Sequence, residues 1–142
     1  MFDPKKVYGQ QAISTISAEE AMIKLHEKIL ERIERIKELN EDIRNLSAKE
    51  IAKNVDKFNK LLNERGKQVD LVINSIDAIK GLISDDVNIY LKEQIWETYN
   101  SIKIAFLKAV LDREEKYFTD VEDSIKILLE GWRENFRIQS EK

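Results

Sequence analysis

This chain of 142 residues has no cysteine, one proline (Pro4), one histidine (His26) and four glycines. Without cysteine it forms no disulfide, no thiolate metal site and no cysteine nucleophile, and the absence suits a reducing compartment. A ferritin-like di-iron site needs a histidine from each of two Glu-x-x-His motifs, and the residue three places before His26 is Ile23. We interpret His26 as a boundary residue that packs partly on the core and reaches solvent, rather than as a haem ligand. We therefore expect no metal and no cofactor.

The sequence also lacks long apolar runs and a large excess of charge of one sign. No stretch approaches the roughly 20 apolar residues that span a bilayer, and the first residues are not followed by the apolar segment of a signal peptide. The net charge is only −3 with both signs mixed, whereas nucleic-acid binders usually carry a basic excess. We expect a cytoplasmic protein that neither inserts into a membrane nor binds nucleic acid.

Motifs that carry catalysis are missing as well. The glycine spacing of phosphate-binding loops and the G-x-S-x-G signature of serine hydrolases do not occur. The many acidic residues alternate with Lys and Arg at helical spacing, which is typical of solvated helix faces. The sequence therefore predicts no catalytic residue and a protein that is not an enzyme.

The sequence is rich in helix signals, with 36% charged and 42% apolar residues. Ser17, Ser47 and Thr119 each precede a glutamate by three residues, the capping-box pattern that marks a helix start. Apolar residues at spacings of three and four then predict four helices. Their stripes are Met22, Leu25, Ile29, Ile36 and Ile43; Ile51, Val55, Phe58, Leu62, Val69, Val72, Ile76, Ile79 and Ile83; Ile95, Tyr99, Ile102, Phe106 and Ala109; and Phe118, Val121, Ile125, Leu128, Trp132 and Phe136.

These four helices, joined by short connections, predict an all-α fold, an antiparallel four-helix bundle formed by residues 17–142. The second stripe loses its register at Arg65 beside Gly66, which leaves open a kink or a short loop there. Residues 1–16 have no sustained stripe and are expected to form an irregular, flexible cap segment that docks on the bundle. Trp132 is predicted to lie in the core, whereas Trp96 and Tyr90 either widen the core face or form an exposed binding patch.

Two parts of the chain follow a known pattern. The first part matches a Tyr-x-Gln segment followed by Thr-x-Ser-Pro-Glu-Glu, at Tyr8, Gln10, Thr15, Ser17, Glu19 and Glu20. The second part matches two later helices, one at Tyr99, Ile102, Phe106 and Ala109 and the other at Val121, Leu128 and Trp132. In these residues the chain resembles the FliS family of bacterial flagellin export chaperones. Ala18 replaces the usual proline, His26-Glu27-Lys28 replaces Tyr-Asp-Gly, and residues 40–85 form a longer middle region. The resemblance covers roughly half of the chain.

The resemblance implies a cytoplasmic helical bundle that binds the C-terminal segment of flagellin, prevents its premature polymerisation and presents it for type III export. Export-apparatus or other flagellar proteins are further expected partners. The resemblance also suggests partner-binding residues, some in a covering N-terminal segment and some in or under a groove. These residues are Val7, Tyr8, Ile13 and Ile16 in the segment, and Leu25, Tyr99 and Ile102 at the groove.

Two alternatives remain open from the sequence. Leu25, Tyr99 and Ile102 lie on core stripes, so ordinary core packing also explains them, most of all for Ile102. The second alternative concerns function: a structural or adaptor bundle that self-associates or binds a different helical partner.

Overall fold

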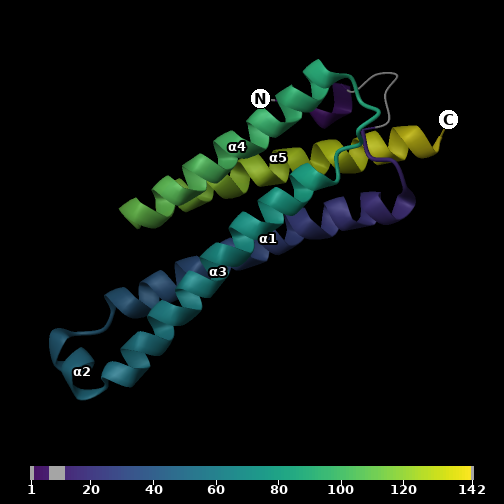
Figure 1. The fold of residues 1–142 in the computed structure, drawn as a ribbon. Helices are drawn as coiled ribbons and strands as arrows, with labels where there is room; N and C mark the ends of the chain where they lie inside the picture. The colour runs from purple at the N-terminus through teal and green to yellow at the C-terminus, as the bar shows by residue number, and fades with distance from the viewer. Residues whose placement is uncertain (1, 7–11, 142) are drawn as a thin grey trace.

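Four long helices make up most of the computed structural model, which describes residues 2–6 and 12–141 (Figure 1). In chain order the elements are the 3-10 helix η1 (Pro4–Lys6) and the α-helices α1 (Ile16–Arg44), α2 (Ala48–Lys53), α3 (Val55–Gly81), α4 (Ile89–Asp112) and α5 (Glu115–Ser140). The described residues contain no β-strand, so the predicted all-α class is confirmed for them. Helix α1 packs against α3 and α5, and α4 packs against the same two helices, an arrangement compatible with a four-helix bundle.

The helix starts follow capping chemistry, although not always at the predicted residue. The Thr15 side chain accepts a hydrogen bond from the Ala18 N–H at 3.0 Å, so Thr15 rather than Ser17 caps α1. The prediction of Ser47 as a cap is confirmed, because it accepts from the Glu50 N–H at 3.1 Å. The prediction of Thr119 as a cap is wrong, since Thr119 lies inside α5 and its hydroxyl donates to the Glu115 carbonyl at 3.2 Å.

The second predicted stripe is interrupted at Asn54 rather than at Gly66. The Asn54 side chain accepts from the Lys57 N–H at 3.0 Å and starts α3 directly after α2. Gly66 lies in the middle of α3, where a Cβ would meet no neighbouring atom. Glycine costs about 1 kcal/mol relative to alanine in a helix interior, a small loss beside the burial of the α3 stripe further along.

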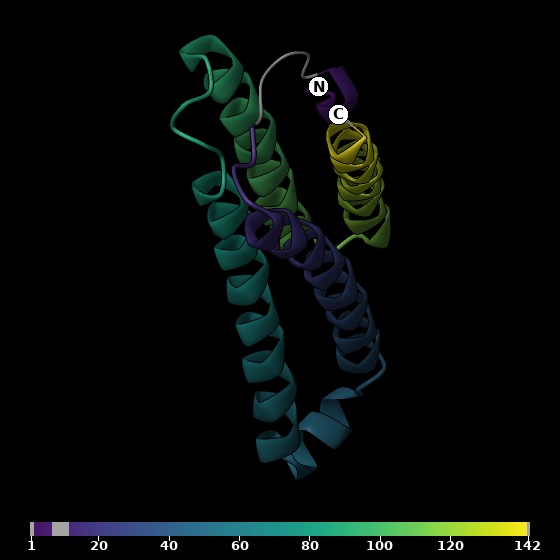
Figure 2. The same ribbon diagram turned by 90° about the vertical axis from the view of Figure 1, so that its right-hand side faces the viewer.

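The core lies at the end of the molecule where all four long helices meet. Its fully buried members include Met22, Ile29, Ile33, Ile36, Val72, Ile76, Ile79, Ile95, Tyr99, Phe106, Ile125, Leu128 and Trp132. The prediction that Trp132 belongs to the core is therefore confirmed. In contrast, no residue between 41 and 71 is fully buried. Helix α2 and the adjoining ends of α1 and α3 extend past α4 and α5 as a thinner arm (Figures 1 and 2).

Candidate functional site

A groove runs along the seam between α4 and α5. It consists of two adjoining hollows of about 790 and 170 Å³, which share Ile102, Ala105 and Ser124 as lining residues. On α4 the lining extends from Leu91 to Lys108, which at the rise of an α-helix is about 26 Å. The groove is therefore long enough for several turns of a further helix.

The shape of the groove follows from small side chains on both helices. Ser101, Ala105 and Ser124 line it where longer residues would fill the seam. Small side chains let a neighbouring helix axis approach closely. Apolar residues of both helices share the lining, Leu91 and Ile102 on α4 and Tyr117 and Val121 on α5. Together with the small residues they give the groove a partly apolar lining that suits an amphipathic helix.

The N-terminal segment lies at one end of this groove. Phe2 lines the larger hollow, and its backbone N–H donates to Thr98 Oγ1 at 3.1 Å. The Phe2 ring lies 5.7 Å from the Trp132 ring, between centroids. The side chain of Asn135 donates to the Pro4 carbonyl at 3.0 Å. These contacts join the segment to α4 and to α5.

Gly131 provides the space that this segment needs on α5. A Cβ placed on Gly131 would lie 2.8 Å from Cδ of Pro4, closer than real side chains approach. Pro4 itself is buried against this surface. A glycine at this position therefore lets Pro4 pack directly against α5, where a larger residue would clash with it.

Beneath the groove, a chain of buried hydrogen bonds connects three helices. Trp132 Nε1 of α5 donates to the Tyr99 hydroxyl of α4 at 2.8 Å, and the hydroxyl lies 2.6 Å from His26 Nε2 of α1. His26 Nδ1 lies 2.6 Å from the Met22 carbonyl, which only accepts, so Nδ1 carries the proton. His26 Nε2 is therefore the acceptor for the Tyr99 O–H, and every polar side-chain atom of His26, Tyr99 and Trp132 has a hydrogen-bond partner.

Burial determines the ionisation of the two titratable residues in this series of hydrogen bonds, His26 and Tyr99. Desolvation lowers the pKa of His26 to about 4, although its hydrogen bond to the Met22 carbonyl raises it slightly. Burial also raises the pKa of Tyr99 above its usual range, against the hydrogen bond from Trp132. Both groups are neutral near pH 7. His26 is fully buried with both ring nitrogens occupied, which corrects its interpretation as a boundary residue that reaches solvent.

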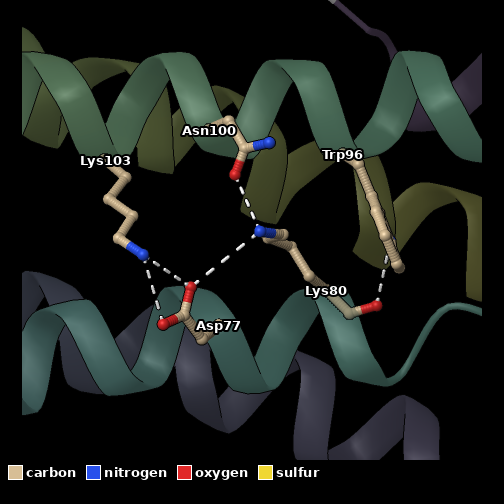
Figure 3. Close-up of polar contacts among 5 residues, drawn as sticks. All are labelled: Asp77, Lys80, Trp96, Asn100 and Lys103. Carbon is tan, nitrogen blue, oxygen red and sulfur yellow. Dashed lines mark hydrogen bonds and ion pairs between the residues drawn. The ribbon is translucent and has the colours of Figure 1, made fainter.

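On its other side, α4 is fastened to α3 by polar contacts (Figure 3). Lys103 Nζ lies 3.0 Å from Asp77 Oδ1, and Lys80 Nζ donates to Asn100 Oδ1 at 2.7 Å. Trp96 Nε1 donates to the Lys80 carbonyl at 3.1 Å, near the end of α3. Of the two alternatives for Trp96, the widened core face is wrong: the residue is 39% exposed and lies across the seam between α3 and α4. Tyr90 is exposed.

A second buried polar contact lies between α1 and α5. Glu122 is buried and pairs with Lys37, which also pairs with Glu34 at 3.2 Å. Burial raises the pKa of Glu122, and its hydrogen bond with the Glu34 carboxyl raises it further. Across the described parts of the chain, no cluster of three or more His, Cys, Asp or Glu side chains is arranged to hold a metal ion. Within the same residues, no helix is long and apolar enough to cross a bilayer.

The structure places the predicted partner-binding residues in different environments. Val7 and Tyr8 lie outside the described residues. Ile13 is buried in the core cluster, whereas Ile16, the first residue of α1, is 75% exposed. Leu25 is half-buried against the core.

The two predicted groove residues on α4 lie at different depths. Tyr99 is fully buried below the groove, in the hydrogen-bond chain. Ile102 is almost fully buried and lines both hollows of the groove. Ile102 therefore belongs both to the core and to the groove floor.

The sequence interpretation missed the residues that shape the groove. Ser101, Ala105 and Ser124 are small residues on solvated positions, and Phe2 and Pro4 precede the first recognised pattern. A signal was present for the first group: Leu91, Thr98, Ser101, Ala105 and Lys108 follow one helical face beside the core stripe, with spacings of three, four and seven.

No family model, no curated protein and no solved structure matches this chain.

Proposed function

We propose that this protein is a flagellar export chaperone that binds the C-terminal segment of flagellin as an amphipathic helix in the groove between α4 and α5. In this proposal the four long helices serve as an antiparallel four-helix bundle in the cytoplasm. Binding keeps the flagellin segment from polymerising early and presents it for type III export. The resemblance to the FliS family supports flagellin as the partner, and the groove supports the seam between α4 and α5 as the place where it binds.

The single observation that carries the binding role is the groove itself. It is lined by the small residues Ser101, Ala105 and Ser124 and by the apolar residues Leu91, Ile102 and Val121. Helix-in-groove recognition buries apolar residues of the ligand at helical spacing against such a surface. A segment that folds on binding loses conformational entropy, so it needs an extended apolar contact, which a groove of about 26 Å provides.

In the same proposal, the N-terminal segment acts as a cap at one end of the groove. Phe2 and Pro4 hold the segment there through an aromatic contact with Trp132 and hydrogen bonds with Thr98 and Asn135. The segment thus closes one end of the groove and leaves the rest of the lining open to a ligand.

The test is calorimetry of the full chain with a peptide covering the C-terminal helical segment of flagellin from the same genome. We expect a one-to-one complex, and Ala105→Asp should weaken it by at least about tenfold because it places a charge in the lining of the groove, under the apolar face of the ligand. Ile89→Asp is the matched control, since Ile89 is 60% exposed on α4 but does not line the groove. An absence of binding by the unmodified protein, or equal loss in both variants, would contradict the proposal.

A further inference from the structure

The charged residues that line the groove are unevenly distributed. The larger hollow, at the end occupied by Phe2, contains two acidic residues, Asp3 and Glu97, and no basic one. The smaller hollow contains one residue of each sign, Lys108 and Asp120. The lining is therefore net acidic, and the acid is concentrated at one end.

The acidic pair differs from the acidic residues on the opposite side of α4. There, Asp77 pairs with Lys103 at 3.0 Å, and Asp85 pairs with Lys92 at 2.7 Å. Among the described residues, neither Asp3 nor Glu97 forms an ion pair with a basic side chain; Asp3 Oδ1 accepts only the backbone N–H of Lys5, at 3.0 Å. Within residues 2–6 and 12–141, the groove thus presents two carboxylates without a basic partner.

We infer that the groove between α4 and α5 selects an amphipathic helix with a basic polar flank, whose lysine or arginine side chains pair with Asp3 and Glu97 while its apolar face lies on Ile102, Ala105 and Ser124. This inference deepens the proposed function and rests on it for the location of the site, but not for the name of the partner. An acidic helix in the same place would face two like charges, which weakens binding and disfavours encounter. Charge complementarity of this kind sets specificity more than affinity.

The ionic contribution is modest because the acidic residues stand at the edge of the groove. Each exposed ion pair contributes little, so two pairs gained against two repulsions avoided should separate a basic from an acidic ligand by about tenfold at low salt. Added salt at about 0.5 M should shrink this ratio, since the Debye length falls to a few ångströms.

The experiment uses two synthetic helical peptides with the same Leu and Ala apolar face, one with lysines and one with glutamates on its polar flanks. Fluorescence anisotropy of each labelled peptide with the full chain should give about tenfold tighter binding of the lysine peptide. Glu97→Gln together with Asp3→Asn should remove most of this preference. Asp70→Asn, on α3 away from the groove, is the matched control and should leave the preference unchanged.

Several outcomes would overturn the inference: equal affinities, tighter binding of the glutamate peptide, binding of neither peptide, or the same loss of preference in the Asp70→Asn control. Light scattering that shows a dimer whose groove excludes both peptides would assign the surface to a second copy of the chain and would also overturn it. The two proposals fail separately. Binding of the lysine peptide without binding of flagellin would reject the proposed partner alone, and the reverse would reject the charge preference alone.

Discussion

The two sides of α4 solve the same packing problem in opposite ways. Toward α3, hydrogen bonds and an ion pair bridge the seam (Figure 3), and they are formed by Asp77, Lys80, Trp96, Asn100 and Lys103. Toward α5, small residues leave an open groove with a partly apolar lining. One helix is thus fastened on one side and left available on the other, which is what a rigid binding surface requires.

The position of α4 on both sides depends on the buried series of hydrogen bonds from Trp132 through Tyr99 to His26. This series lies inside the core and joins α5, α4 and α1, so it fixes α4 relative to the helix that forms the other wall of the groove. Disturbing it should change both seams at once, whereas disturbing one seam should leave the other intact. Three predictions separate these cases.

The largest expected effect comes from acid. The pKa of His26 is about 4 in the fold and near 6.5 when the chain unfolds, so between these values the unfolded state binds more protons. The free energy of unfolding should therefore fall by about 3 kcal/mol as the pH drops from 6.5 to 4, with little further loss from this group below pH 4. Urea titrations across this range measure it.

The matched variant for this prediction is His26→Gln, whose side-chain oxygen still accepts a hydrogen bond but does not titrate here. His26 is the only histidine, so the difference between the two pH profiles isolates its contribution. The raised pKa of Glu122 acts in the opposite direction and is common to both proteins. Parallel profiles for the two proteins would mean that buried His26 does not govern the acid response.

The second effect is smaller and concerns the link in the middle. Tyr99→Phe removes the hydroxyl that accepts from Trp132 and donates to His26, leaving two buried polar atoms without partners. Each such loss costs about 1–3 kcal/mol, partly offset by the hydroxyl no longer being buried, so we expect about 2 kcal/mol less stability by urea unfolding. A loss of stability below about 0.5 kcal/mol would show that these two hydrogen bonds contribute little to holding α1, α4 and α5 together.

The smallest effect belongs to the fastened seam. Asp77→Asn removes the charge that pairs with Lys103 and lies 4.0 Å from Lys80. Because these side chains are partly exposed, the loss should stay below about 0.5 kcal/mol, measured by thermal unfolding, and ligand binding should be unaffected. If this variant weakened binding at the groove, the two sides of α4 would be coupled rather than independent.

The helical core was largely predictable from the sequence because apolar periodicity is a local signal that packing then reinforces. Ile29, Ile76, Phe106 and Trp132 all lie on predicted stripes and are fully buried. Helix ends were less predictable. Thr119 has the capping pattern, yet α4 ends at the left-handed Arg113 (φ 56°) and α5 starts soon after, before Thr119 is reached.

The groove could not be derived in the same way, because an open seam depends on how two helices lie relative to each other. Tyr99 and Ile102 share a stripe, but only Ile102 reaches the floor of the groove while Tyr99 points to His26. Ser101 and Ala105 do follow one helical face of α4, but a face of small and polar residues is also typical of a solvated helix surface, so this signal does not by itself indicate a groove. The contact of Pro4 with Gly131 is also invisible, since it joins the two ends of the chain.

The central claim is that a partner segment occupies the groove and not the opposite seam. The chain has no cysteine, so Ser124→Cys and Asn100→Cys each give a protein with a single thiol, one in the groove and one on the α3 side. Alkylation rates of both thiols should be measured with and without a saturating flagellin segment. We predict strong slowing at position 124 and no change at position 100. Equal rates at 124 in both conditions, or slowing at 100 alone, would contradict the account.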